Sequence, residues 1–249
     1  DLEKDPTRYG HWTDDMHPCY LPDGGIAFTS TRPEQSVLCG GHELTVTNLH
    51  RVESDGSRLR RLSQGALSEF CPTVMNDGRI LYNRWEYVDK GAGAVQALWA
   101  MHPDGGRPEE VYGDAITTPA VFNQARQVPD RNNLLVCLGC AHCPGNMGAI
   151  LTVDLHKNKR YEGAMTALTP GCVPEGNWGL RQRRNGRWMT DIYGPWYSDP
   201  FPLSDATQRE LAGKFYLVSC NPEGMWNDPA GYGICLLDVF GNRVPVYAD

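Results

Sequence analysis

Two stretches of the chain carry the same pattern of apolar and polar positions. Residues 15–32 read DMHPCYLPDGGIAFTSTR, and residues 69–84 read EFCPTVMNDGRILYNR. In both, an acidic residue stands three positions before a proline, and then come an apolar run, Asp-Gly and an alternation of apolar and polar residues. Such alternation is typical of a strand with one buried face. Asp-Gly between two such runs predicts a two-residue hairpin turn, because glycine adopts positive φ at little steric cost.

The segments that follow each copy also repeat. Residues 44–63 and residues 97–112 each hold two strand-like runs separated by Asp-Gly. Four strands with two Asp-Gly turns, repeated about every 50 residues, are typical of a β-propeller blade. A single blade cannot bury both of its faces, so it must stack on its neighbours. We therefore predict an all-β fold, a β-propeller of four-stranded antiparallel blades, that forms a single domain over residues 1–249.

The predicted blades cover residues 15–63, 69–112, 115–162 and 163–249. The third unit lacks Asp-Gly, and its inner strand is expected to follow Pro119, which places Thr118 at the position before the proline. The looser fourth unit holds the one plausible short helix, at 205–212. Propellers close with about four to eight blades, so these units form either a small ring or, in our interpretation, an incomplete one. The chain begins at Asp1 without a charged and then apolar leader, so we interpret it as a processed or truncated piece.

The charge pattern argues against two classes of partner. The net charge is −7, and the charged residues, 21% of the chain, are scattered rather than grouped in blocks. Such a balance argues against general binding of nucleic acid or of an anionic membrane surface. No apolar run approaches the ~20 residues that a membrane-spanning helix needs.

The chain has nine cysteines, an odd number, so at least one thiol is unpaired within it. Cys19 directly follows Pro18, whereas Cys71 directly precedes the equivalent Pro72. Our main interpretation is that the cysteines are buried free thiols that act as small apolar side chains. The alternative is an oxidising compartment in which some of them form disulfides.

Candidate ligand-binding residues lie where the inner strands begin. In a propeller these strands surround a central channel, so the residues just before Pro18 and Pro72 are expected at its mouth. Asp15 and Glu69 occupy equivalent positions there. A ring of Asp15, His17, Glu69 and, from the third unit, His142 is predicted to bind a cation or a polar ligand. The alternative is that these groups cap strands and bond to amides of the neighbouring blade.

A second candidate is the sequence CLGCAHC at residues 137–143. Thiols and imidazole are ligand types that zinc prefers, and His142, Cys143 and Cys140 are the predicted ligands. A strand ending at residue 139 directs Cys137 away from such a site. An intervening alanine also distinguishes the segment from C-x-x-C-H, the attachment motif for c-type haem. The alternative interpretation is a loop of free thiols near the channel.

No complete catalytic motif is present, and catalytic residues cannot be assigned from the sequence. The chain lacks both the G-x-S-x-G elbow of hydrolases and a glycine-rich phosphate-binding loop. The adjacent carboxylates Asp14-Asp15 and Glu109-Glu110 fall on predicted strands, where neighbouring side chains point to opposite faces. Neither pair therefore forms a catalytic dyad.

The pattern Pro-x-x-x-x-Asp-Gly in both copies resembles the WD-like repeats of TolB-type β-propellers. A longer set of segments is similar to the middle, propeller domain of the hydrazine synthase α subunit and its relatives: residues 82–91, 98–101, 139–142, 200–204 and 233–242. This resemblance covers most of the chain. Relatives tend to carry Gly-Ala-His-His where this chain keeps His142 and has Cys143 in place of the second histidine.

The resemblance implies a non-catalytic scaffold in a larger periplasmic or secreted protein, where the propeller positions other domains and partner subunits. In that family the chemistry belongs to c-type haems held by C-x-x-C-H motifs elsewhere, and this chain has no such motif. We therefore expect no cofactor in this chain, and any c-type haem in regions outside it. The alternative function is a metal-binding or ligand-binding propeller, or an enzyme, with a polar site at the channel mouth.

Overall fold

The computed structural model describes residues 13–37, 46–86, 95–142, 145–173, 194–204 and 207–247, together with the backbone of 183–184 and 187–188. This part of the chain is all-β, as predicted. Its only helical segments are short 3-10 turns: η2 (Glu162–Ala164), η3 (Pro170–Cys172), η4 (Arg209–Leu211) and η5 (Pro229–Gly231). The helix expected at 205–212 is thus reduced to η4, and residues 205–206 lie outside the described residues.

Sixteen of the strands form four groups of four, which we call the first to the fourth blade. The first holds β1 (Asp15–Tyr20), β2 (Ile26–Ser30), β3 (Asn48–Val52) and β4 (Arg60–Arg61). The second holds β5 (Glu69–Val74), β6 (Ile80–Trp85), β7 (Gln96–Met101) and β8 (Glu109–Tyr112). The third holds β9 (Val121–Gln127), β10 (Leu134–Cys140), β11 (Gly148–Asp154) and β12 (Met165–Ala167). The fourth holds β15 (Trp196–Pro202), β16 (Phe215–Asn221), β17 (Gly233–Asp238) and β18 (Arg243–Tyr247).

Two details differ from the strand pattern expected from the sequence. β12 lies beyond residue 162, where we expected the third blade to end, because the chain passes through η2 before it pairs with β11. A separate pair, β13 (Arg183–Arg184) and β14 (Arg187–Trp188), forms a small two-stranded sheet between the third and fourth blades along the chain. The division into one domain over residues 1–249 stays a prediction.

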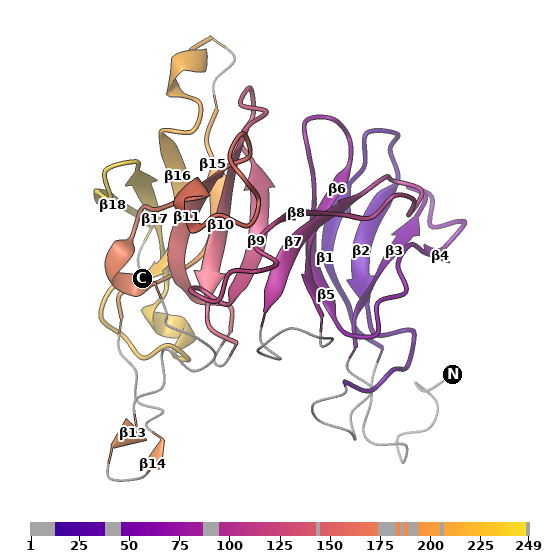
Figure 1. Cartoon of the computed structure of the whole chain (residues 1–249), viewed down its shortest axis with the longest axis horizontal. Helices are drawn as coiled ribbons and strands as arrows, with labels where there is room; N and C mark the ends of the chain where they lie inside the picture. Colours follow the sequence, from indigo (N-terminus) through magenta and orange to yellow (C-terminus); the bar gives the residue numbers. More distant parts are fainter. Residues whose placement is uncertain are drawn as a thin grey trace.

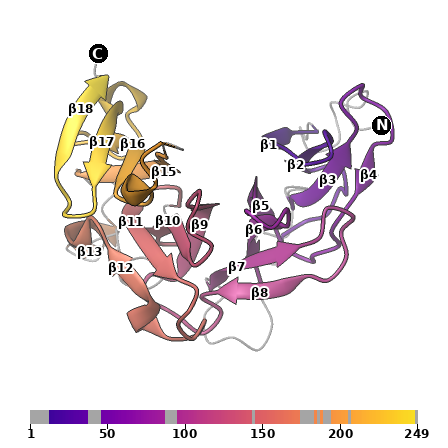
Figure 2. The ribbon, with the colours of Figure 1, turned by 90° about the horizontal axis from the view of Figure 1, so that it is seen from above.

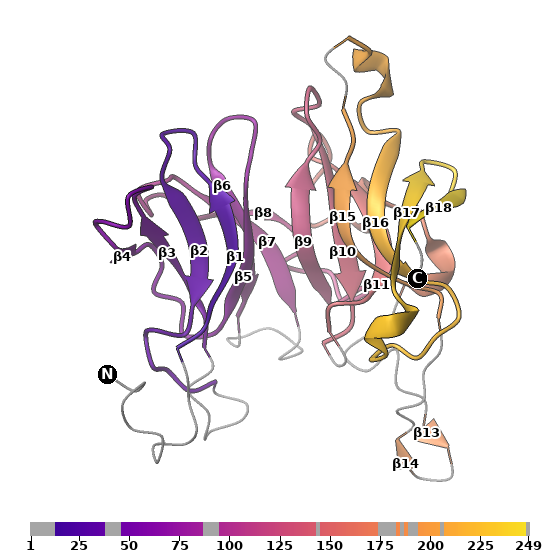
Figure 3. The same cartoon turned by 180° about the vertical axis from the view of Figure 1, so that it is seen from behind.

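The four blades are arranged around a common centre, which Figure 2 shows from above. Strands β1, β5, β9 and β15 lie innermost, and the arc is open between the first and the fourth blade. β1 contacts β5, β5 contacts β9 and β9 contacts β15, and Figures 1 and 3 show these sheets from the side. The fold is therefore a β-propeller that is incomplete within this chain, as the sequence predicted.

The blades are joined in two ways. Single bridges, Gln96 to Val121 and Gly148 to Tyr197, link the second, third and fourth blades into one continuous path of strands. The first blade is a sheet of its own. It is held to the second blade at Thr47, whose carbonyl accepts from the N–H of Glu69 at 2.9 Å and whose hydroxyl donates to the carbonyl of Glu69 at 2.8 Å.

Apolar side chains from alternate strand positions fill the spaces between blades. The larger core cluster extends from the second to the fourth blade and includes Leu98, Phe122, Leu138, Ile150 and Tyr216, all fully buried. A smaller cluster joins the first and second blades and includes Leu21, Leu49, Ile80, Tyr82 and Met101. Each such large side chain contributes about 1.5–3 kcal/mol when it leaves water. Stacking of the blades therefore provides the main stabilisation of the fold.

The Asp-Gly turns contain one residue more than expected. The N–H of Leu21 donates to the carbonyl of Gly25 at 2.7 Å, which leaves three residues in the loop. Gly24 alone takes positive φ, at 86°, while the carboxylate of Asp23 accepts from the N–H of Gly25. This is a turn with a glycine bulge, and the hydrogen bond from the N–H two residues ahead to the Asp carboxylate stabilises it. Equivalent loops close at 53–57, 75–79 and 102–106.

Each innermost strand carries a β-bulge at the same place, where two of its residues oppose one residue of the next strand. The first residue of each bulge has positive φ although it is not glycine: His17 (54°), Cys71 (49°), Gln124 (51°) and Asp199 (50°). We call these four residues the axial ring. Gln124, and not Thr118, is thus the third-blade equivalent of His17, because the inner strand starts after Pro119 and the bulge lies further along it.

The seven described cysteines form no disulfide, in agreement with the free-thiol interpretation; Cys39 and Cys143 lie outside the described residues. No described helix has the length and apolar character needed to cross a membrane.

Candidate ligand site at the mouth of the ring

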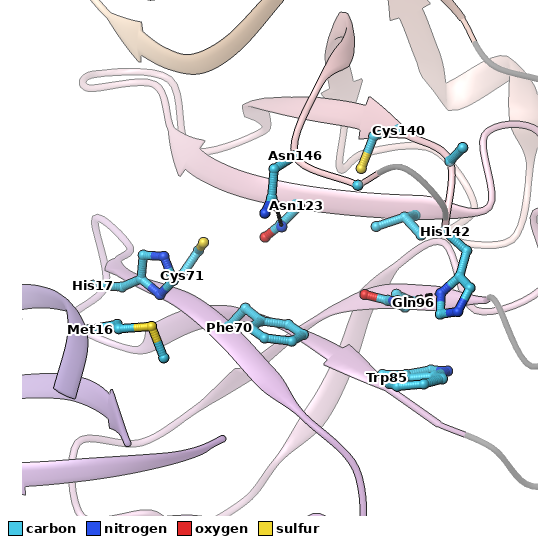
Figure 4. A pocket seen from close by; sticks show the side chains of 13 residues that line it. Met16, His17, Phe70, Cys71, Trp85, Gln96, Asn123, Cys140, His142 and Asn146 are labelled. Atoms are coloured by element: carbon cyan, nitrogen blue, oxygen red, sulfur yellow. Dashed lines mark hydrogen bonds between the residues drawn. The ribbon is translucent and has the colours of Figure 1, made fainter. Parts of the chain in front are cut away.

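A pocket of about 390 Å³ lies beside the inner strands of the first three blades, and we call it the mouth pocket. Figure 4 shows His17 and Cys71 on one side of it and Trp85, Gln96 and His142 on the other. None of the described side chains that line it carries a formal charge when its histidines are neutral. The pocket therefore suits an uncharged ligand that offers both apolar surface and hydrogen-bonding groups.

His17 reaches the pocket from the bulge of β1. Its Nδ1 lies 3.2 Å from Oγ1 of Thr29, and that hydroxyl donates to the carbonyl of Met16 at 3.1 Å. Because the only hydroxyl proton of Thr29 goes to Met16, Nδ1 of His17 acts as the donor and Nε2 keeps its lone pair. Burial lowers the pKa of His17, and the carboxylate of Asp199 acts in the opposite direction. His17 is therefore a neutral hydrogen-bond acceptor at neutral pH.

His142 follows β10 and packs against Trp85 of β6. The ring centroids are 5.0 Å apart and the planes are inclined by 53°. Nε2 of Gln96, on β7, lies 3.3 Å from Nδ1 of His142. Burial lowers the pKa of His142, so this ring is also neutral at neutral pH. Trp85 and His142 provide two aromatic rings, inclined to each other, and a planar ligand can stack against either ring.

The two thiols of the pocket are protonated. Burial raises the pKa of Cys71 and of Cys140 to about 12 each. Backbone N–H groups act against burial in both cases, from Gln124 and from Asn146 respectively. Thiols with such pKa values are poor nucleophiles and poor metal ligands at neutral pH. They contribute shape and weak hydrogen bonding to the pocket.

The structure brings together two of the four residues predicted for the channel mouth, since His17 and His142 line the same pocket. Asp15 instead pairs with Arg32 at 2.5 Å and is exposed. Glu69 is 1% exposed and faces the first blade, where it accepts from Nδ2 of Asn48 at 3.1 Å and from the hydroxyl of Ser63. For Glu69 the contacts match the alternative interpretation, a buried polar group bonded to a neighbouring blade.

The predicted zinc ligands are only partly described. Cys140 and His142 both line the mouth pocket, whereas Cys143 lies outside the described residues. Within the described ranges no three His, Cys, Asp or Glu side chains are grouped closely enough to hold a metal ion. The zinc site stays a prediction.

Both cysteines of β10 are buried. Cys137 is fully buried in the larger core cluster, and Cys140 is 1% exposed. The expectation that any c-type haem lies outside this chain stays a prediction.

Sequence reasoning missed several residues of the site. Gln96 and Asn123 line the mouth pocket but stand on strands that carry no motif. Gln124 was missed because the third unit was aligned on Pro119. Asp199 directly precedes a proline, Pro200. His17 and Cys71 also directly precede prolines, so this shared pattern is the sequence signal that could have identified Asp199.

Comparison with known proteins concerns the fold. No protein-family model matches the sequence, and no curated protein matches it either. Among solved structures, the chain is similar to hydrazine synthase from Kuenenia stuttgartiensis, with 17% identity and a TM-score of 0.61, over 90% of this chain and 28% of that chain. It is also similar to TolB from Agrobacterium tumefaciens, with 13% identity and a TM-score of 0.52, over 92% of this chain and 63% of that one.

A third similar structure is that of a puromycin hydrolase, with 14% identity and a TM-score of 0.50, over 94% of this chain and 29% of that chain. The chain thus spans less than two thirds of the length of each of these three proteins. At such identities the likeness concerns the fold and not the activity. The chain has the fold of a TolB-like β-propeller.

Proposed function

We propose that this chain is a scaffold and interaction part of a larger exported protein related to the hydrazine synthase α subunit. The observation that carries the proposal is an apolar face of the fourth blade that the described residues leave partly exposed. We further propose that this face is covered by another blade of the same ring. Other domains or subunits of the larger protein are then the partners, and any haem chemistry takes place outside this chain.

The two faces of the fourth blade differ in what covers them. Tyr216, Val218 and Cys220 alternate along β16 and belong to the larger core cluster against the third blade. Leu217, on the same strand, points to the other face and is paired across the sheet with Leu236 of β17, which is paired with Val244 of β18. Val244 is 60% exposed. Together with Ile234, 44% exposed, these residues form what we call the open face.

An apolar row that runs across three adjacent strands is typical of a surface that another protein layer covers. Each sheet-to-sheet contact described between blades of this chain buries such rows. The arc is open on the side of the fourth blade, where a further blade has room to stack (Figure 2). Continuity with the existing interfaces therefore favours a further blade as the occupant of the open face.

Similarity to longer proteins also supports the proposal. The matched part of hydrazine synthase is 28% of its chain, so there the same fold is one part of a larger protein. Export is proposed from the resemblance to TolB-type and hydrazine synthase propellers.

The test uses the 249-residue chain and a double variant, Leu236→Lys with Val244→Lys. We expect the wild-type chain to self-associate in light scattering and to bind an apolar dye, because the open face lacks its cover. The double variant should lose both properties and keep its Tm within a few degrees. Leu59→Lys, at an exposed apolar residue of the first blade, is the matched control and should behave as wild type. A wild-type chain that stays monomeric, binds no dye and is unchanged by the double substitution contradicts the proposal.

A second candidate function is favoured by the mouth pocket, in which an aromatic surface and neutral histidines face a volume of about 390 Å³. The pocket supports binding of an uncharged planar ligand. A screen of such compounds by tryptophan fluorescence tests this candidate. Hits that bind wild type but not Trp85→Leu support it, and hits unaffected by that substitution count against it.

A further inference from the structure

The axial ring places one polar side chain from each blade beside the centre of the arc. Its four members are an imidazole, a thiol, an amide and a carboxylate: His17, Cys71, Gln124 and Asp199. All four line a second pocket of about 110 Å³, which adjoins the mouth pocket and to which Arg126 also contributes. Segments that are more than fifty residues apart in the sequence thus meet at equivalent positions of one repeated bulge.

The backbone at these positions favours glycine, yet the chain places glycine at none of them. Positive φ is strained for residues that carry a Cβ, and such strain is concentrated at functional sites. Glycine takes positive φ in the Asp-Gly turns, and five further residues that are not glycine also do so: Glu34, Arg58, Arg107, Asp130 and Asn146. The ring differs from these in that its four members lie at equivalent bulges and line one pocket.

The ring residues are already oriented by hydrogen bonds. Oε1 of Gln124 accepts from the N–H of Asp199 at 2.8 Å, which leaves the amide NH₂ of Gln124 to donate elsewhere. Oδ2 of Asp199 accepts from the hydroxyl of Ser198 at 2.8 Å. The guanidinium of Arg126 lies over the ring of Phe201, 5.1 Å from its centroid. Gln124 and Asp199 are thus held by hydrogen bonds, and the charged side chains of Asp199 and Arg126 are exposed to solvent.

Charge indicates what the pocket accepts. Asp199 provides one negative charge and Arg126 one positive charge, while His17 is neutral and Cys71 is protonated. The described residues do not form a metal site here. A small ligand that carries both an ammonium and a carboxylate group satisfies both charges at once. We propose that the axial ring binds a small zwitterion of the α-amino acid type, with its ammonium group at Asp199 and its carboxylate at Arg126.

The test is an NMR titration of the 249-residue chain with glycine, and with methylammonium and acetate as probes that carry only one of its charges. Glycine should shift the resonances of His17 and Gln124. Each single-charge probe should bind at least about tenfold more weakly, the factor that corresponds to one charge-assisted hydrogen bond. The absence of any shift with glycine overturns the proposal, and so does acetate binding as tightly as glycine.

Variants locate the site. Asp199→Asn and Arg126→Gln should each weaken glycine binding at least about tenfold. Arg209→Gln and Glu210→Gln, which alter two exposed charges on η4, are the matched controls and should leave it unchanged. If the controls weaken binding as much as the ring variants, the ligand binds elsewhere and the proposal is wrong.

Substitution by glycine separates binding from folding. Asp199→Gly keeps the N–H that donates to Gln124 and relieves the strain at positive φ, so it should raise Tm by about 2–4 °C while glycine binding is lost. A lower Tm together with unchanged binding contradicts the proposal. The open face of the fourth blade takes no part in this test, so its outcome is independent of the scaffold function.

Discussion

At the bulge of β1, His17 and Pro18 together oppose the single residue Phe28, and the positive φ of His17 turns its imidazole toward the mouth pocket. Asp15, two residues earlier on the regular part of the strand, pairs with Arg32 instead. The sequence predicted His17 and His142 as site residues from their chemistry, and both line the mouth pocket. It could not show that a bulge at His17 turns this side chain away from the direction that Asp15 takes. A bulge depends on how the strand pairs with another segment, which the local sequence does not reveal.

At the residue scale, the contact between His142 and Trp85 predicts a pH-dependent signal. Burial lowers the pKa of His142 below its ordinary value of 6.5, so the ring gains its charge only as the pH falls further. An imidazolium in contact with indole quenches its fluorescence. We expect tryptophan emission to fall with a midpoint below pH 6.5, and His142→Gln should abolish that transition. His156→Gln, at a histidine outside the pocket, is the control; a transition that survives His142→Gln counts against the contact.

Glu69 provides a second prediction at this scale. Burial raises the pKa of Glu69 above its ordinary value of 4.5, and the hydrogen bonds from Ser63 and Asn48 act in the opposite direction. An acid whose pKa is raised by folding stabilises the folded state below its unfolded pKa, and that stabilisation is lost as the pH rises through the folded pKa. Glu69→Gln should therefore flatten the decline in the free energy of unfolding that begins as the pH rises above the ordinary pKa of a glutamate. Denaturation series at several pH values measure this, with Glu210→Gln as control, and parallel curves for wild type and Glu69→Gln would contradict it.

At the scale of elements, the hairpin turns were predictable in place but not in geometry. Asp-Gly marked all four of them, because few other dipeptides combine a side-chain acceptor with positive φ. The sequence predicted two-residue loops, whereas each loop holds three residues. The carboxylate of the turn aspartate accepts from the N–H two residues ahead, as Asp23 does from Gly25, and this hydrogen bond favours a bulged turn. The third blade was harder, since its inner strand has no proline after Gln124 to mark the bulge.

The turn at Gly105 allows a test at the element scale. A Cβ there would lie 2.5 Å from the carbonyl oxygen of Leu62, whereas a Cβ at Gly24 would meet nothing within 4 Å. Both glycines have similar positive φ, 90° and 86°. Gly24→Ala should cost about 1 kcal/mol of unfolding free energy, and Gly105→Ala clearly more, because it also pushes the first and second blades apart. Urea denaturation measures the difference, and equal losses would show that the two blades do not meet at this turn.

At the scale of the whole molecule, the repeat predicted a propeller of four units, either a small ring or, in our interpretation, an incomplete one. It could not show where the arc is open or which sheet face is left uncovered. Those features follow from the contacts between blades. Leu236 and Val244 lie on the open face and belong to neither of the described core clusters between blades. The pairing of Leu217 with Leu236 and Val244 becomes visible only once the register is known.

The separate sheet of the first blade predicts uneven stability. Strands of the third blade lie between two neighbours, whereas the described strands of the first blade pack mainly against the second and belong to the smaller core cluster. Amide hydrogens of β2 and β3 should therefore exchange faster than those of β10 and β11. Hydrogen exchange followed by mass spectrometry checks this, and equal protection of the two blades would show that the molecule opens only as a whole.

Four equivalent inner strands bring the axial ring together, and nuclear Overhauser contacts test this arrangement most directly. The backbone amide of Gln124 lies against the thiol of Cys71, and the side-chain amide of Gln124 lies against the backbone of Asp199. We predict cross-peaks from Gln124 to both residues, which link the second, third and fourth blades at one point. Their absence, with the cross-strand contacts inside each blade intact, would show that the blades do not share an axis.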